Sequence, residues 1–192
     1  MGVYFVSVEA DDWANDDLMV AVRGELADAL AQRGIARYDG PPQDVVFGPD
    51  EGDHFEEKLS RDNTGFAHVL REHFDGAPVA NLPFWSMIIP VVVDGLVELT
   101  VPSAYDDRTT IGSSLVVQTA MKTLADLVEL PPLVPRRSDN LNITDWFDEI
   151  EAGTVDVPAG PWRDDLDTAF YIAMFLRAAE FSIHRSCPMR YV

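Results

Sequence analysis

The sequence predicts an α+β fold in which several helices pack on a small mixed or antiparallel β-sheet. Short apolar runs of strand length precede and interrupt helical patterns, without the regular strand–helix alternation of a doubly wound sheet. A β-hairpin signal lies near the middle of the chain, and a helix that is apolar on all sides lies near its end. The chain has 192 residues, 47% of them apolar, and can bury a sizeable core. We expect a single globular domain, with an α/β core at 1–130 and a helical part at 141–192 joined by a proline-rich connection.

The N-terminal part favours a strand, a helix and a second strand. Residues 3–8 (VYFVSV) are β-branched and aromatic, which is typical of a buried strand. An amphipathic helix that Gly34 can end is predicted next, because apolar residues recur at every fourth position: Leu18, Val22, Leu26 and Leu30. VVFG at 45–48 is interpreted as the second strand of a β-α-β unit. Residues 48–63 are acidic and broken by glycine and proline, which predicts a long loop with at most one helical turn.

A β-hairpin is predicted over 84–102. The pair Asp94-Gly95 suits a type I′ turn, and an apolar run flanks it on each side. A two-residue turn would pair Val91 with Glu98 and would place Glu98 on a mostly apolar face. Pro90 lacks the N–H donor that a central strand needs, so the first strand of the hairpin is predicted at a sheet edge or a bulge.

Four helices account for much of the remaining chain. They are predicted over 66–74, over 111–130 up to a pair of prolines, over 143–153, and from Asp164 or Asp165 through 185. The last of these is apolar on every side between 169 and 176, which is typical of a helix buried at the centre of a fold. The final residues, CPMRYV, are compatible with either a short strand or a frayed end.

The charge distribution argues against one class of ligand and favours another. The chain has 33 acidic and 14 basic residues, and its net charge of −19 is unsuited to binding a nucleic-acid backbone. Acidic residues are concentrated at 1–63, with 15 acidic against 5 basic, and at 138–170, with 9 against 1. Such a field would speed association with a basic protein. A second interpretation stays open, in which the acidic residues only solvate the surface or reflect the composition of the host's proteins.

No complete catalytic, metal-binding or cofactor-binding motif occurs in the sequence. Cys187 is the only cysteine, which excludes an intrachain disulfide and a thiolate metal cluster. The stretch VEADDWANDD (8–17) does not fit a calcium loop of the EF-hand type, and is interpreted as a helix start capped by Asn15. Patterns for a serine nucleophile, a dinucleotide or a phosphate loop are missing. Since no apolar run is long enough to span a membrane and no cleavable leader is seen, we expect a soluble, cytoplasmic protein.

Two functions are compatible with these features. The first is an acidic protein–protein interaction module, such as an inhibitor or immunity-type protein that neutralises a basic, nuclease-like partner. Its predicted partner-binding residues are acidic side chains with aromatic anchors among them: Asp11, Asp12, Trp13, Asp16, Asp50, Glu51, Asp53, Trp146, Asp148 and Trp162. The alternative is a small enzyme or small-molecule-binding domain, with a pocket near the 103–114 loop formed by Glu98, Asp106, Asp107 and Arg108. Partial burial would then raise the pKa of Glu98 and suit it to proton transfer. Neither function implies a cofactor, and the sequence leaves the oligomeric state open.

Overall fold

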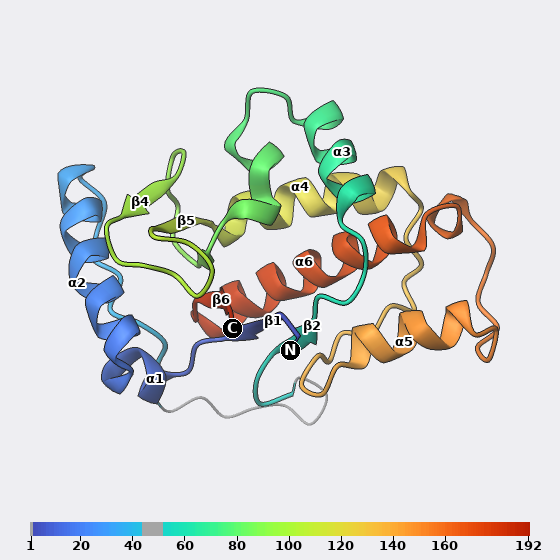
Figure 1. Ribbon diagram of the computed structural model, residues 1–192, viewed down its shortest axis with the longest axis horizontal. Coiled ribbons are helices and arrows are strands. Elements are labelled where there is room, and N and C mark those ends of the chain that lie inside the picture. The colour runs from blue at the N-terminus through green and yellow to red at the C-terminus, as the bar shows by residue number, and fades with distance from the viewer. Residues whose placement is uncertain (1, 44–51) are drawn as a thin grey trace.

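Within the described residues, a six-stranded mixed sheet carries the fold, in the strand order β2-β1-β6-β3-β5-β4 (Figure 1). The structure is a computed structural model that describes residues 2–43 and 52–192. β3 and β5 are parallel, and the other neighbouring strands are antiparallel. The strands are β1 (Tyr4–Ser7), β2 (Glu56–Lys58), β3 (Met87–Ile89), β4 (Val97–Leu99), β5 (Thr109–Ser113) and β6 (Met189–Tyr191). The predicted α+β class with a mixed sheet is confirmed.

Helices cover both faces of this sheet. The buried apolar residues form two core clusters, one on each face of the sheet. Successive side chains of a strand point to opposite faces, so in β3 Met87 and Ile89 belong to the smaller cluster and Ile88 to the larger one. The smaller cluster packs under α1 (Ala10–Asn15) and α2 (Asp17–Gln32). The larger cluster involves the other helices, which are α3 (Thr64–His73), η1 (Pro78–Phe84), α4 (Ser114–Leu127), α5 (Asn142–Glu151), η2 (Pro161–Arg163) and α6 (Leu166–Arg185).

Helix α6 lies at the centre of the larger core. Every residue from Thr168 to Leu176 is buried, and α6 packs against α3, α4 and α5. In Figure 1 it crosses the molecule between α4 and α5. Asp165 caps it by accepting a hydrogen bond from the Thr168 backbone N–H (2.9 Å). The predicted central helix and its start are therefore confirmed, and the residues that follow it form β6, between β1 and β3.

The predicted hairpin over 84–102 is wrong in its pairing. The chain does turn at Asp94-Gly95, where Gly95 has a φ of 74°. However, β3 and β4 each pair with β5, which lies between them. β3 is also an interior strand, between β6 and β5, and not the predicted edge strand. Pro90 does not prevent this position, because β3 ends at Ile89 and the proline lies outside the hydrogen-bonded strand. The local turn specifies a chain reversal but not the partner of the returning strand.

Several predicted boundaries also differ from the structure. Residues 109–113 form β5, so α4 begins at Ser114 and not at 111. The predicted 48–63 loop contains β2, an edge strand of polar residues that pairs with β1. Asp16, rather than Asn15, caps α2, accepting a hydrogen bond from the Met19 backbone N–H (3.0 Å). The strand predicted at 45–48 lies outside the described residues.

Candidate functional site

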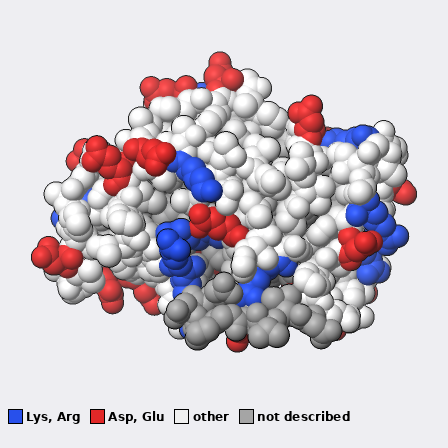
Figure 2. All heavy atoms as spheres, turned by 180° about the vertical axis from the view of Figure 1, so that it is seen from behind, with Lys and Arg blue, Asp and Glu red and all other residues white. Residues whose placement is uncertain are grey.

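The acidic residues predicted to bind a partner come from separate parts of the fold. Asp11 and Asp12 are exposed on α1, whereas Asp148 is exposed on α5, at the opposite end of the molecule (Figure 1). Figure 2 views the molecule from behind and shows acidic side chains in several groups, with uncharged surface between them. On that face, the acidic residues do not form a continuous patch.

The other acidic members of this set have individual roles. Asp16 caps α2, and its Oδ1 lies 3.7 Å from Nη1 of Arg190. Asp53 borders a cavity that is described below. Asp50 and Glu51 lie outside the described residues.

The three predicted aromatic anchors pack mainly inside the protein. Trp13 is 2% exposed and meets Tyr38 edge to face, with ring centroids 5.4 Å apart. Trp162 is equally buried and stacks on Trp146, with centroids 5.9 Å apart. Of the three, only Trp146 is partly exposed. Trp13 and Trp162 therefore contribute to the cores rather than to an acidic surface.

The residues of the predicted alternative pocket are only partly brought together. Glu98 is exposed on β4, because its neighbours Val97 and Leu99 take the buried face of the strand. The expected partial burial of Glu98 is therefore wrong. Its Oε2 lies 3.7 Å from Nη1 of Arg108, in an ion pair open to solvent. Asp107 is exposed in the loop between β4 and β5, whereas Asp106 lines a groove.

We take this groove as the candidate binding site and call it the aromatic groove. Its volume of about 480 Å³ is in the range of small-ligand sites. Two acidic residues line it, Asp62 before α3 and Asp106 in the β4–β5 loop. Five aromatic side chains from distant parts of the chain also line it: Phe84 and Trp85 before β3, Tyr105 in the β4–β5 loop, Tyr171 in α6 and Tyr191 in β6.

Hydrogen bonds hold the β4–β5 loop beside the groove. The Ser103 backbone N–H donates to the Asp106 carbonyl (2.8 Å), and the Asp106 N–H donates to the Ser103 Oγ (3.0 Å). At the base of the loop, the Ser86 N–H donates to the Thr110 carbonyl (2.8 Å), and the Thr110 N–H donates to the Ser86 Oγ (3.0 Å). Asp106 is thus positioned by a closed turn on a sheet strand.

The rings of the aromatic groove differ in exposure. Phe84 and Tyr105 are 74% and 59% exposed, which is unusual for side chains of this size. Trp85 is 3% exposed and lies over Gly112 of β5, where a Cβ atom would overlap its ring. The Trp85 Nε1 has no hydrogen-bond partner within the described residues. The groove therefore combines a fixed, buried ring with two rings that are open to solvent.

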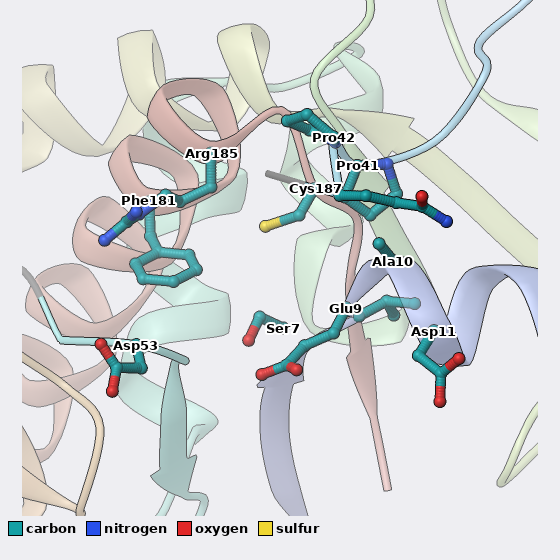
Figure 3. Close-up of a pocket in the computed structure, with 12 residues that line it drawn as sticks. Ser7, Glu9, Ala10, Asp11, Pro41, Pro42, Asp53, Phe181, Arg185 and Cys187 are labelled. Atoms are coloured by element: carbon teal, nitrogen blue, oxygen red, sulfur yellow. The ribbon is translucent and has the colours of Figure 1, made fainter. Parts of the chain in front are cut away.

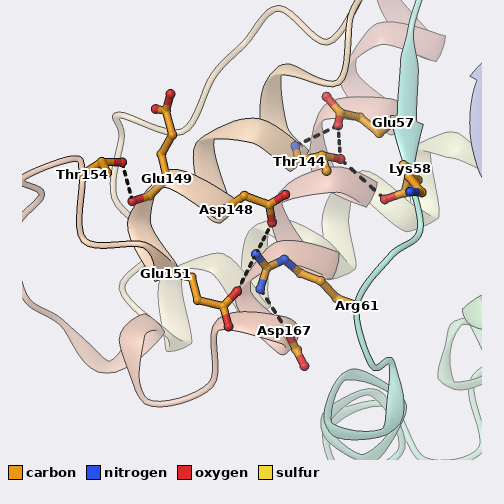
Figure 4. Close-up of polar contacts among 9 residues, drawn as sticks. All are labelled: Glu57, Lys58, Arg61, Thr144, Asp148, Glu149, Glu151, Thr154 and Asp167. Atoms are coloured by element: carbon orange, nitrogen blue, oxygen red, sulfur yellow. Dashed lines mark hydrogen bonds and ion pairs between the residues drawn. The ribbon is translucent and has the colours of Figure 1, made fainter.

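Arg61 is the basic residue among those that line the groove, but its charge is already paired (Figure 4). Its Nη2 lies 2.6 Å from Asp148 Oδ1 and 3.2 Å from Glu151 Oε2, and its Nη1 lies 3.1 Å from Asp167 Oδ1. The Arg61 side chain is 6% exposed. Burial lowers the pKa of Arg61, but the hydrogen bonds to Asp167 and Asp148 outweigh this effect and the net shift is upward. The guanidinium therefore stays charged and is surrounded by three carboxylates.

Apart from the paired Arg61, the titratable groups that line the groove are negative or neutral. Hydrogen bonds from the Thr64 hydroxyl (2.7 Å) and N–H (3.0 Å) hold the pKa of Asp62 below its usual value. Burial raises the pKa of Tyr171 to about 12 and raises the pKa of Tyr191 as well, so both phenols are neutral. Among the described residues, no basic side chain pairs with Asp62 or with Asp106. The groove therefore has a negative electrostatic character.

A buried carboxylate, Glu57 of β2, lies near this site and serves the fold (Figure 4). It accepts hydrogen bonds from the Ile143 N–H (2.8 Å), the Thr144 N–H (2.9 Å) and the Thr144 hydroxyl (2.7 Å). These are free donors of the first turn of α5, whose positive end favours a carboxylate. Burial raises the pKa of Glu57 to about 7, although the three hydrogen bonds act in the opposite direction. Glu57 is therefore a cap for α5 supplied by a distant strand.

A second cavity, of about 410 Å³, lies between the end of β1, the start of α1 and the end of α6 (Figure 3). It holds Cys187, Ser7 and Arg185, side chains that occur in covalent catalysis. However, burial raises the pKa of Cys187 to about 12, so the thiol is protonated at neutral pH. The Ser7 Oγ accepts a hydrogen bond from the Phe55 N–H (3.0 Å), and Arg185 donates to the Gly52 carbonyl (2.9 Å). The described residues therefore present no activated nucleophile in this cavity.

Sequence patterns single out one residue of the aromatic groove, Asp106, as part of the 103–114 loop. Phe84 ends η1 and is exposed, whereas the next residue, Trp85, is buried, and no sequence pattern predicts this difference. Tyr171 and Tyr191 carry no sequence signal either, since their place in the groove depends on how α6 and β6 pack. Arg61 lies in a segment predicted as loop, and its partners are far away in the sequence.

None of the described helices combines the length and the apolar character of a membrane-spanning segment. Among the described residues, no group of three or more His, Cys, Asp or Glu side chains is arranged to hold a metal ion. Comparison with protein-family models, with curated proteins and with solved structures gives no match for this chain. Its function is therefore inferred from the chemistry of the aromatic groove.

Proposed function

We propose that the protein is an acidic binding module that engages a basic partner protein and takes one cationic side chain of that partner into the aromatic groove. The observation that carries the proposal is the combination of aromatic rings with Asp62 and Asp106, beside a single basic residue, Arg61, that is already paired. A cation is attracted both to the face of an aromatic ring and to a carboxylate. An anionic ligand would be repelled by the same two carboxylates.

The net charge and the exposed rings support the same class of partner. A protein of net charge −19 attracts a basic partner over long distances and orients it before contact. Phe84 and Tyr105 are exposed at the groove and would lose water-accessible area when a partner covers them. Aromatic side chains of this kind are enriched among residues that dominate binding energies.

A more specific form of the proposal concerns the biological role. A nuclease-like toxin with a basic surface is one partner that fits, and the module would then act as its inhibitor or immunity protein. The support for this form is the sign and the size of the net charge.

The proposal is tested with a fluorescein-labelled nona-arginine peptide and the variants Asp106→Asn and Asp107→Asn. Both variants remove one negative charge from the same exposed loop, but only Asp106 lines the groove. We expect Asp106→Asn to weaken binding by about fivefold to tenfold, because a direct contact with the cation is lost. Asp107→Asn is expected to change the affinity by less than about twofold. Fluorescence anisotropy at near-physiological salt measures both affinities.

Equal effects of the two substitutions would contradict the proposal, since binding would then follow the overall charge and not the groove. Both positions are exposed, so folding should be preserved, and circular dichroism with thermal melting verifies this for each variant. Tyr105→Ala provides an independent test, because it removes an exposed ring of the groove without altering any charge. It should weaken binding, whereas Val92→Ala, at an exposed apolar position outside the groove, should not.

A further inference from the structure

We infer that the cationic group received by the aromatic groove is the guanidinium of an arginine side chain on the partner, in preference to the ammonium of a lysine. This inference rests on the proposed function and specifies the ligand of the same site. It depends on which hydrogen-bond acceptors in the groove are free to bind a ligand. It also depends on how well a planar cation can contact an aromatic ring and a carboxylate at the same time.

The hydroxyl groups beside the groove are largely occupied by the protein itself. Ser86 Oγ accepts from the Thr110 N–H (3.0 Å), and Ser103 Oγ accepts from the Asp106 N–H (3.0 Å). The Tyr171 hydroxyl donates to the Arg61 carbonyl (2.6 Å). The groups left to attract a cation are the exposed rings of Phe84 and Tyr105 and the acidic residues Asp62 and Asp106.

Rings and carboxylates together match a guanidinium better than an ammonium. A guanidinium is planar and weakly hydrated, so one face can lie on a ring while its edge donates two parallel hydrogen bonds to a carboxylate. An ammonium is compact and strongly hydrated, and loses more of its hydration when it contacts a ring. The exposed rings of Phe84 and Tyr105 and the nearby carboxylate of Asp106 supply both kinds of contact.

The protein already uses this arrangement for one of its own arginines. The guanidinium carbon of Arg61 lies 5.8 Å from the ring centroid of Phe147 and 5.7 Å from that of Phe170. The same guanidinium donates hydrogen bonds to Asp148 (2.6 Å) and Asp167 (3.1 Å). The aromatic groove is lined by the same two types of residue, aromatic and acidic, at a site open to solvent.

The experiment compares four acetylated and amidated peptides that differ only at a central position, which is arginine, lysine, citrulline or norleucine, with glycine and serine elsewhere. Binding to the full ¹⁵N-labelled chain is followed by NMR titration of the Tyr105 and Asp106 amides and the Trp85 indole N–H. We expect the arginine peptide to bind about fivefold or more tightly than the lysine peptide. Citrulline has nearly the same shape without the charge, and we expect its peptide, like the norleucine peptide, to cause no saturable shifts. Methylguanidinium is titrated as a separate probe for free small molecules.

Two variants connect the preference to the ring of Tyr105. Tyr105→Leu keeps an apolar side chain but removes the aromatic face, and should reduce the preference for arginine over lysine to less than about twofold. Tyr105→Phe keeps the ring and should retain the preference. Both substitutions are at an exposed position with no hydrogen bond from the side chain found among the described residues, so neither should unfold the protein.

The outcomes separate this inference from the proposed function. If the arginine and lysine peptides bind equally and Asp106→Asn weakens both, the basic-partner proposal stands and the arginine preference is overturned. If no cationic peptide shifts the groove resonances, the basic-partner proposal and the arginine preference are both overturned. If methylguanidinium binds as tightly as the arginine peptide, the site recognises a free guanidinium compound, and an arginine held in a partner's chain is overturned as the ligand.

Discussion

Arg61 is the residue whose surroundings are most unusual in this protein. Its side chain is nearly buried and joins the segment between β2 and α3 to two helices, through Asp148 of α5 and Asp167 of α6. Asp148 and Asp167 lie 87 and 106 residues away along the chain. The Arg61 charge is buried and costly to leave unpaired, whereas the side chains of its three carboxylate partners are 41–66% exposed and remain in contact with water.

For single residues, we predict that Arg61→Leu lowers the free energy of unfolding by about 1–2 kcal/mol, because two charge-assisted hydrogen bonds are lost while water screens the three exposed carboxylates that remain. Urea denaturation followed by tryptophan fluorescence measures the change. Arg108→Leu is the matched control, since its ion pair with Glu98 is exposed, and should change the stability by less than about 0.5 kcal/mol. Similar effects at the two positions would show that Arg61 contributes no more to stability than an exposed ion pair does.

At the scale of elements, α5 is held at both of its ends by β2 and the residues after it. Glu57 of β2 caps its first turn, and Arg61 binds Asp148 and Glu151 near its last turn. Between these polar contacts, Phe147 and its neighbours on α5 pack into the larger core. The short, polar strand β2 is thus explained by its role in anchoring α5.

The Glu57 cap predicts a dependence of stability on pH. The pKa of Glu57 is about 7 in the folded protein, above the ordinary value of 4.5, so the folded state binds this proton more tightly than the unfolded state. The resulting stabilisation is fully present below pH 4.5 and is lost as the pH rises through 7. Stability of the natural protein should therefore decline relative to that of Glu57→Gln between these values.

Two measurements check this expectation. Urea denaturation of both proteins from pH 4.5 to 8 gives the difference in free energy of unfolding, and ¹³C NMR of the Glu57 side chain gives its pKa directly. A pKa below 4.5 would mean that the hydrogen bonds from Ile143 and Thr144 outweigh burial, and the pH dependence would then have the opposite sign.

At the scale of the whole molecule, the charge of −19 acts separately from the contacts in the groove. A long-range field changes how fast partners meet, whereas contacts inside a site change how slowly they separate. Because the acidic groups are spread over several parts of the surface, we expect the field to attract a basic partner without selecting one docking face (Figure 2).

We therefore predict that association with the nona-arginine peptide slows by about tenfold or more when ionic strength rises from about 10 to 150 mM, as the Debye length falls from about 30 to 8 Å. Asp106→Asn should keep nearly the same salt dependence and should mainly raise the dissociation rate. Stopped-flow fluorescence measures both rates. An association rate that does not respond to salt would count against a role for the net charge in binding.

The α+β class and most helices can be predicted from the sequence, because the spacing of apolar residues and the caps are local properties of the chain. The sequence also predicted α6 as a central helix from its apolar run, and it placed Asp106 in a loop beside a candidate pocket. Three features emerge only in the folded protein: β3 and β4 lie on either side of β5, Glu57 caps a helix that begins 86 residues away, and five aromatic residues line one groove. These contacts join distant segments, and which segments meet depends on the packing of the whole core rather than on any short pattern.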